Sequence, residues 1–176
     1  MSNNIIQTSR LLLRPIKADD IQHIYHGLSH PEVIRYYGVS FDSLEATQEQ
    51  MTWFAQLEQE QTGRWWAVCS ADDLTFYGAG GFCDWDHTHR KAEIGFWLIP
   101  DYWGKGIMKE AMPLICQYGF KEMKLHRIEG FVDARNSNCK RAMAKVNFVH
   151  EGTMQDCEVK DGTFLSLDIF ACLSQY

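Results

Sequence analysis

The segment from Glu93 to Met108 constrains the fold most, because a buried strand leads into a helix through two closely spaced glycines. The apolar run 92–99 stops at Pro100, and Gly104-Lys105-Gly106 precedes residues with helical periodicity. The first N–H groups of a helix lack intrahelical partners, and glycines let a ligand approach the backbone closely. With the helix dipole, these groups predict a cradle for pyrophosphate. An ordinary tight turn is the alternative explanation.

The glycine loop differs from two other phosphate-binding fingerprints. A Walker-type loop needs the pattern G-x-x-x-x-G-K-[ST], which this segment lacks. Met108 and Lys109 stand where the dinucleotide-binding fingerprint has its third glycine. A plain nucleotide-binding protein is therefore disfavoured.

The rest of the chain mixes strand and helix signals. Helical spacing is expected over about 19–28, from Ser43 to about 60, over 104–120 and over 138–146. Strands are expected at 11–13, 65–69, 77–83, 92–99 and 127–132, with a polar loop over 84–90. An Asp161-Gly162 turn predicts a hairpin of 148–159 with 164–173. This order is typical of a mixed α+β fold, not of a regular βαβ alternation.

Length and charge narrow the classes further. The 176 residues fit one domain spanning 1–176, with 45% apolar and 23% charged residues. A net charge of −6 argues against a nucleic-acid partner or an anionic membrane surface. No apolar run approaches the roughly 20 residues that span a bilayer, and the first residues do not resemble a signal peptide. We therefore expect a cytoplasmic location.

The six cysteines do not indicate a zinc site. They stand at positions 69, 83, 116, 139, 157 and 172, and no pair has the C-x-x-C spacing. The chain is large enough to fold without disulfides, so buried free thiols are the preferred interpretation. We expect no metal.

Several motifs follow one another in an order that identifies a family. These are Thr8 to Pro15 with Asp19-Asp20, His30 to Val33, Ala92 to Leu98, Trp103 to Met108, Asn136 with Cys139 and Asn147-Phe148, and Asp161-Gly162 with Asp168. In this order they resemble the GNAT N-acetyltransferases, and within them the ribosomal-protein alanine N-acetyltransferases (RimJ/RimL-like). The resemblance implies a single GNAT-like domain. Its central twisted sheet is mostly antiparallel, contains one splayed parallel strand pair, and is flanked by helices.

The chain departs from the family pattern at a few positions. The general loop is [Q/R]-x-x-G-x-[G/A], and here Trp103 fills its first position and Met108 its last. Phosphate contacts in this loop are mostly made by the backbone, so we expect binding to survive. In the late motif, Cys139 replaces the usual serine and Asn147 the usual glycine.

The resemblance implies acetyl-CoA as the co-substrate, lying where the central strand parts from 127–132. Its pantetheine amides are expected on the backbone edge at Phe96, Trp97, Leu98 and Ile99, with the Asn136 side chain nearby. Its pyrophosphate is expected on Trp103, Gly104, Lys105, Gly106, Ile107 and Met108. Lys140 or Arg141 is a further candidate for the adenosine phosphates.

Two residues are the catalytic candidates. Glu93 matches the residue type and near-equal spacing of the general base in histone-acetylating relatives, and its alternative role is structural. Asp84 and Asp86 are weaker candidates for the base. Cys139 is the candidate acid for the leaving thiolate, since thiols of similar pKa exchange a proton readily. Simple packing of Cys139 is the alternative.

The predicted function is acetyl transfer from acetyl-CoA to a primary amine by direct attack in a ternary complex. The branch suggests a protein N-terminal α-amine, and a small amine such as a polyamine or amino sugar is the alternative. Residues 25–61 and the hairpin around 148–164 are expected to select the acceptor. A non-catalytic acyl-CoA-binding module is the alternative from another class. Homodimers are common in the family, so a homodimer is compatible with the resemblance.

Overall fold

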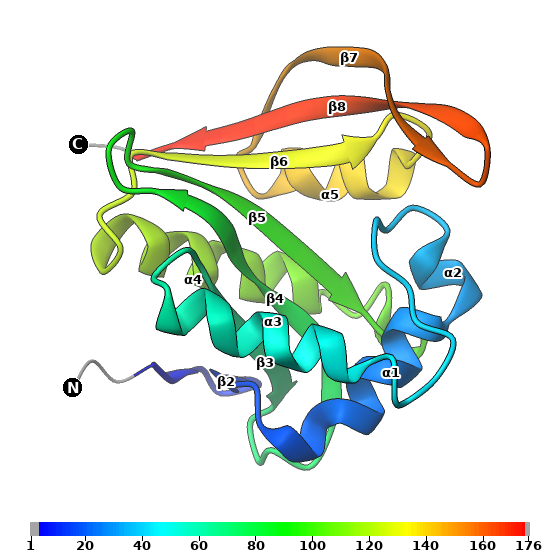
Figure 1. Ribbon diagram of the computed structural model, residues 1–176. Coiled ribbons are helices and arrows are strands. Elements are labelled where there is room, and N and C mark those ends of the chain that lie inside the picture. The colour runs from blue at the N-terminus through cyan, green and yellow to red at the C-terminus, as the bar shows by residue number, and fades with distance from the viewer. Residues whose placement is uncertain (1–3, 175–176) are drawn as a thin grey trace.

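One eight-stranded sheet organises the chain in the computed structural model, which describes residues 4–174 (Figure 1). Its strands lie in the order β1-β2-β3-β4-β5-β6-β8-β7. They comprise β1 (Ile6–Gln7), β2 (Leu11–Pro15), β3 (Arg64–Ser70), β4 (Phe76–Asp86), β5 (Lys91–Leu98), β6 (Arg127–Asp133), β7 (Val149–Lys160) and β8 (Thr163–Leu173). Neighbouring strands are antiparallel except β5 and β6, which are parallel. The expected α+β fold with one parallel pair is confirmed.

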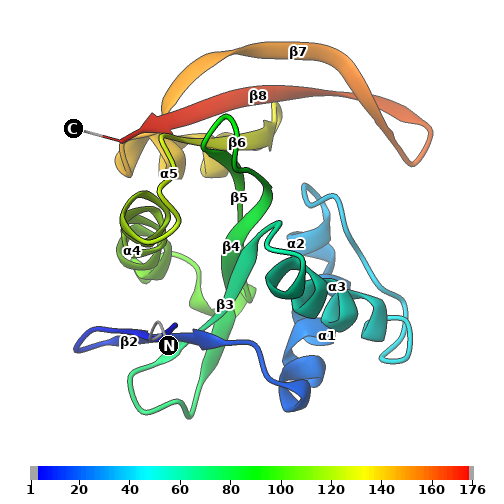
Figure 2. The ribbon, with the colours of Figure 1, turned by 60° about the vertical axis from the view of Figure 1, so that its left-hand side comes forward.

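Helices cover both faces of the sheet, as Figure 2 shows. One face carries α1 (Ile21–Ser29), α2 (Pro31–Ile34) and α3 (Gln48–Gln59). The other carries α4 (Ile107–Lys121) and α5 (Ser137–Lys145). Short 3-10 turns at Ala18–Asp20 and Pro100–Tyr102 precede α1 and α4. No helix within residues 4–174 has the length and apolar character needed to cross a membrane.

The two helical layers bury two separate apolar clusters. Phe82 and Ile115 belong to the cluster between the sheet and α4. Ile24, Phe54 and Trp97 belong to the cluster under α1 and α3. Because side chains alternate across a strand, successive residues of β5 enter different clusters. The central strand is thus held on both faces, and this fixes the position of its free edge.

Glycines of β4 let it pack closely against its neighbours. A Cβ at Gly78 would lie 2.1 Å from the carbonyl oxygen of Trp97, and one at Gly80 would lie 2.3 Å from the Phe96 ring. The backbones of β4 and β5 therefore approach each other closely at these glycines. Any side chain at Gly78 would push β5 away, so these glycines help set where β5 lies.

Most expected elements are present, with shifted ends. The polar segment 84–90 is partly strand, because β4 continues to Asp86 and pairs with Lys91. The second helix begins at Gln48, and the turn before it starts near Ser43. Asp161 and Gly162 form the tip of the hairpin, both with positive φ, as the Asp-Gly signal predicts.

Candidate active site

The parallel strands β5 and β6 pair only at their beginning. Lys91, Ala92 and Glu93 pair with Arg127, Ile128 and Glu129, and the strands then separate. β6 continues to Asp133 beside β8, while β5 continues to Leu98 beside β4. The splay expected between these strands is confirmed. It leaves the backbone edge of β5 beyond Glu93 without a strand partner on the β6 side.

The direction of the peptide groups shows which residues face this open edge. The N–H of Ile99 donates to the carbonyl of Tyr77, toward β4, at 2.9 Å. Peptide groups alternate along a strand, so those of Phe96 and Leu98 point toward the β6 side. The indole N–H of Trp103 donates to the carbonyl of Leu98 from that side at 2.8 Å. Phe96 therefore offers its N–H and C=O groups, and Leu98 its N–H group, to an extended amide chain, while the Leu98 carbonyl already accepts from Trp103.

The glycine loop has the backbone that its sequence predicts. Gly104 and Gly106 have φ values of 73° and 77°, the left-handed region that favours glycine. A Cβ at either position would meet no atom within 4 Å, so the loop borders open space. Gly106 is the N-cap of α4, and the helix begins at Ile107 instead of Gly104. The N–H groups of its first turn are available to a phosphate group.

The N-terminal segment anchors this loop, a role that the sequence did not suggest. Arg10 donates to the carbonyl of Lys105 at 3.1 Å and forms an ion pair with Glu110 at 3.2 Å. Thr8 donates to the other carboxylate oxygen of Glu110 at 2.7 Å. The motif that opens the chain therefore contributes to the shape of a loop about a hundred residues away.

Asn136 and Cys139 lie together at the start of α5. The Asn136 side-chain oxygen accepts the backbone N–H of Cys139 at 3.0 Å and caps the helix. This leaves the Nδ2 group of Asn136 as a donor. Burial raises the pKa of the Cys139 thiol to about 11, so the thiol keeps its proton at neutral pH.

Lys140 already has two partners inside the protein, and its predicted phosphate contact stays a prediction. Its ammonium donates to the carbonyl of Ala134 at 2.7 Å and pairs with the buried Asp168 at 2.9 Å. Asp168 also accepts the hydroxyl of Thr153. These contacts hold the turn before Asn136 against β8, so Lys140 has a structural role. Arg141 contacts Asn138 on its own helix, and its predicted phosphate contact stays a prediction.

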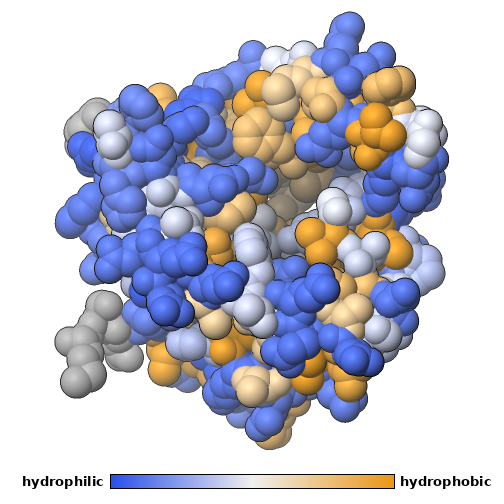
Figure 3. Space-filling model, viewed as in Figure 1, coloured by the Kyte–Doolittle hydropathy of each residue, from blue (hydrophilic) through white to orange (hydrophobic). Residues whose placement is uncertain are grey.

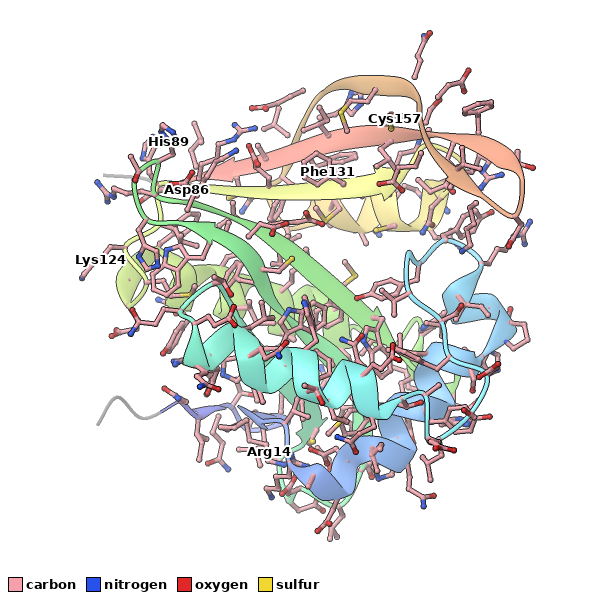
Figure 4. The ribbon with its side chains drawn as sticks, in the orientation of Figure 1. Arg14, Asp86, His89, Lys124, Phe131 and Cys157 are labelled. Atoms are coloured by element: carbon pink, nitrogen blue, oxygen red, sulfur yellow. The ribbon has the colours of Figure 1, made fainter. Side chains whose placement is uncertain are left out.

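Glu93 lies at the point where β5 and β6 begin to separate. Its carboxylate, the Asp84 carboxylate and the Cys83 thiol lie within 4.8 Å of one another. Burial, and then the negative charges of Asp84, Glu129 and Glu158, raise the pKa of Glu93 to about 7. A carboxylate with this pKa can accept a proton near neutral pH. Asp86 lies at the β4–β5 turn, where it pairs with Lys91, and its carboxylate accepts the His89 N–H (Figure 4).

Aromatic residues form the surroundings of Glu93 on the face that carries α1 to α3. The Tyr37 hydroxyl lies 3.6 Å from the position of a Cβ on Gly95, two residues beyond Glu93. Burial, followed by the charges of Cys83 and Glu93, raises the pKa of Tyr37 well above its usual range. Trp65 packs against Gly95 and is 5% exposed, yet its indole N–H has no hydrogen-bond partner among residues 4–174. A ligand or water oxygen here would satisfy this buried donor.

The hairpin tip is joined to the loop after α2. The ammonium of Lys160 donates to the carbonyls of Ile34, Arg35 and Tyr37, the last at 2.9 Å. Figure 3 shows the molecular face hollowed between the β6–β8–β7 layer and the α1–α2 region. The segments expected to select the acceptor therefore meet at one side of the splay. Tyr37 and Lys160 were not singled out in the sequence, because nothing local marks their contact.

Comparisons with known proteins agree with this architecture. Residues 10–149 match the model of the acetyltransferase (GNAT) domain. An uncharacterized N-acetyltransferase of Bacillus subtilis, YoaA, is 33% identical over 168 residues, which cover 95% of each chain. The chain therefore belongs to the GNAT acetyltransferase family, and it is an acyltransferase. This confirms the family and the enzyme class predicted from the motifs.

Two solved structures share the fold. The RimL ribosomal-protein acetyltransferase in complex with coenzyme A has a TM-score of 0.86 at 18% identity, covering 96% of this chain and 97% of that one. The spermidine N-acetyltransferase of Vibrio cholerae in complex with CoA and spermine has a TM-score of 0.83 at 20% identity, covering 94% and 96%. At these identities the likeness shows the fold and leaves the acceptor open.

Proposed function

We propose that this enzyme transfers the acetyl group of acetyl-CoA to the N-terminal α-amine of a protein, by direct attack in a ternary complex. The observation that carries the proposal is the position of Glu93. A carboxylate whose pKa is raised to about 7 lies at the apex of an opened parallel strand pair. The free edge of β5 and the glycine loop lead away from it on one side, and the acceptor segments approach on the other.

The co-substrate fits the features of this region. The outward peptide groups of Phe96 and Leu98 match the amides of an extended pantetheine arm. The open space over Gly104 and Gly106 suits a pyrophosphate, as does the start of α4. Asn136 offers its Nδ2 group to the arm, and Trp97 and Ile99 hold the strand by packing into the apolar cluster under α1. Trp103, Lys105, Ile107 and Met108 complete the proposed binding loop.

The chemical step requires an amine without its extra proton. Glu93, directly or through a water molecule, takes that proton, and the amine nitrogen forms a bond to the thioester carbon. The second proton that this nitrogen loses as it becomes an amide passes to solvent. The carbon–sulfur bond breaks, and the electron pair stays on the sulfur of coenzyme A. The thiol of Cys139 is the proposed donor of a proton to this sulfur, and solvent then restores the proton of Cys139. Because burial raises the pKa of this thiol to about 11, above that of an ordinary thiol, solvent competes with it as the donor. If Cys139 only packs, solvent supplies this proton.

A small cationic amine is the second candidate acceptor. The negative charges of Asp84, Glu129 and Glu158 act on Glu93 at the proposed amine position, and of these Glu129 is already paired with Lys91 and Arg127. Such a group attracts a positively charged substrate. The spermidine acetyltransferase among the structural neighbours was crystallised with spermine. A cytoplasmic location, a single domain over 1–176 and a homodimer stay predictions.

Mass spectrometry tests the proposal directly. The purified enzyme is incubated with acetyl-CoA and a panel of N-terminal peptides, polyamines and amino sugars. We expect acetylation at the α-amine of one class of peptides. Transfer to polyamines alone would support the second candidate, and binding of acetyl-CoA with no transfer to any amine would contradict the proposal.

A further inference from the structure

A cavity of about 240 Å³ lies beside the acceptor segments and has no place in the mechanism above. It opens between the loop after α2, the turn after β6 and the tip of the β7–β8 hairpin. Three of its lining residues are cations and one is an anion, although the whole chain has a net charge of −6. The lining residues are Arg35, Tyr36, Arg135, Lys160, Asp161, Thr163 and Leu165.

The three cations differ in how many hydrogen-bond and ion-pair partners they already have. Lys160 donates to three backbone carbonyls, and Arg135 pairs with the buried Asp133 at 2.7 Å. The exposed guanidinium of Arg35 stacks over the Tyr36 ring, 5.1 Å from its centre. Arg35 has no ion pair within the described part of the chain. It therefore offers the most available charge, and Arg135 keeps its Nη1 group for a second contact.

Two chain segments connect this cavity to the surroundings of Glu93. On β7, Glu158 influences Glu93, and Lys160 lines the cavity two residues later, about 6.6 Å along a strand. In the loop after α2, the Tyr37 hydroxyl lies 3.6 Å from the position of a Cβ on Gly95, two residues beyond Glu93. The adjacent Tyr36 lines the cavity, and consecutive Cα atoms are about 3.8 Å apart. The acceptor side thus has an acidic inner end and a basic outer end, separated by only a few residues.

We propose that the cavity binds an anionic group of the acceptor, a carboxylate, while the amine of the same molecule reaches Glu93. This inference rests on the proposed function and names its substrate class. An extended peptide advances about 3.3–3.6 Å per residue, so the first side chains after the amine are the ones to test, and we place the carboxylate on an acidic side chain at the second or third position. A polyamine would place a second cation at Arg35, and we therefore expect it to be a poor acceptor.

Matched peptides test this charge pairing. The probes are heptapeptides that begin with alanine and carry Asp, Asn or Lys at the second or third position, with spermidine alongside them. Because charge-assisted hydrogen bonds are stronger than neutral ones, we expect kcat/KM for the better Asp peptide to exceed that of its Asn partner about tenfold. The preference should shrink as salt is added, because Arg35 is exposed.

A charge reversal separates recognition from a structural effect. Arg35→Glu should invert the ranking of the peptides by kcat/KM, so that Lys peptides become better substrates than Asp peptides. Lys121→Glu, the same charge change at the end of α4, should leave the wild-type order intact. Equal use of the three peptides by the wild type, or an unchanged order in Arg35→Glu, would overturn this inference while leaving acetyl transfer to peptides in place. Acetylation of spermidine alone would instead contradict the proposed acceptor as well.

Discussion

The two sides of the splay between β5 and β6 are built in different ways. The proposed acetyl-CoA side consists mainly of one continuous segment, 93–108, in which strand, turn and helix follow directly. The proposed acceptor side joins segments that are far apart, such as Tyr37 and Lys160, which are 123 residues from each other in the chain. The first side has local signals in the sequence, while the second exists only after the chain has folded. We therefore expect changes on the two sides to affect different kinetic constants.

The largest effect is expected from Glu93→Gln, which removes the proposed base between the two sides. General-base catalysis contributes about 10²–10⁴-fold, so kcat/KM should fall within that range. The variant should also be more stable than the wild type above pH 7. In the wild type the pKa of Glu93 is higher in the folded than in the unfolded chain. The folded wild type therefore loses stability as the pH rises from the pKa of the unfolded chain toward about 7.

Comparison of the two pH ranges provides the control for this variant. The stability gain, about 1–2 kcal/mol after allowance for solvent screening, should vanish below pH 4, where the carboxyl is protonated in both states. Urea unfolding at pH 4 and pH 8 measures it. A purely structural Glu93 would give the opposite result, with less stability and little change in turnover.

The second effect concerns the acetyl-CoA side alone. Gly106→Ala puts a methyl group into the open space of the loop and should raise the Kd of acetyl-CoA at least about tenfold. Gly162→Ala is matched to it, since Gly162 also has positive φ, 74°, and also borders open space. Both should lose about 1–2 kcal/mol of stability, which thermal melts can follow. Calorimetry that shows equal acetyl-CoA binding by the two variants would argue against phosphate binding at this loop.

The third effect concerns the acceptor side alone. Lys160→Met keeps the apolar stem but removes the hydrogen bonds that join the hairpin to the loop after α2. We expect the KM for the acceptor to rise about tenfold, because hydrogen bonds from charged groups are among the stronger ones. The KM for acetyl-CoA should not change, and Lys121→Met serves as the reference. An equal rise in both constants would show that the two sides are not separate.

The smallest effect is expected at Cys139. Cys139→Ala should lower kcat a few-fold, less than about tenfold, with both KM values unchanged, because solvent can replace the acid. Cys139→Ser keeps a proton donor and should recover most of the rate. If Cys139 only packs, the alanine variant will lose stability in a thermal melt and keep its kcat.

The same contrast explains what could be predicted from the sequence. Gly104, Gly106 and the Asp161-Gly162 turn require particular backbone angles, so residue type alone identifies them. The strand continues to Asp86 despite its polar residues, because Asp86 pairs with Lys91 and the side chains of Asp84 and Asp86 stay at least partly in contact with solvent. Arg10, Tyr37 and Lys160 act through contacts made only in the folded chain. The contact of Lys140 with Asp168 could not be predicted for the same reason, since Asp168 lies on β8.

The pH dependence of kcat/KM, measured for the wild type, Glu93→Gln and Asp84→Asn, tests the central claim most directly. The account predicts a wild-type rate that rises with pH and levels off above about 7, as Glu93 loses its proton. The rise near pH 7 should move to lower pH in Asp84→Asn, which removes a neighbouring negative charge. In Glu93→Gln only the rise that follows loss of the proton from the substrate amine itself, at about pH 8, should remain. The same rise in all three proteins would contradict the assignment of Glu93 as the base.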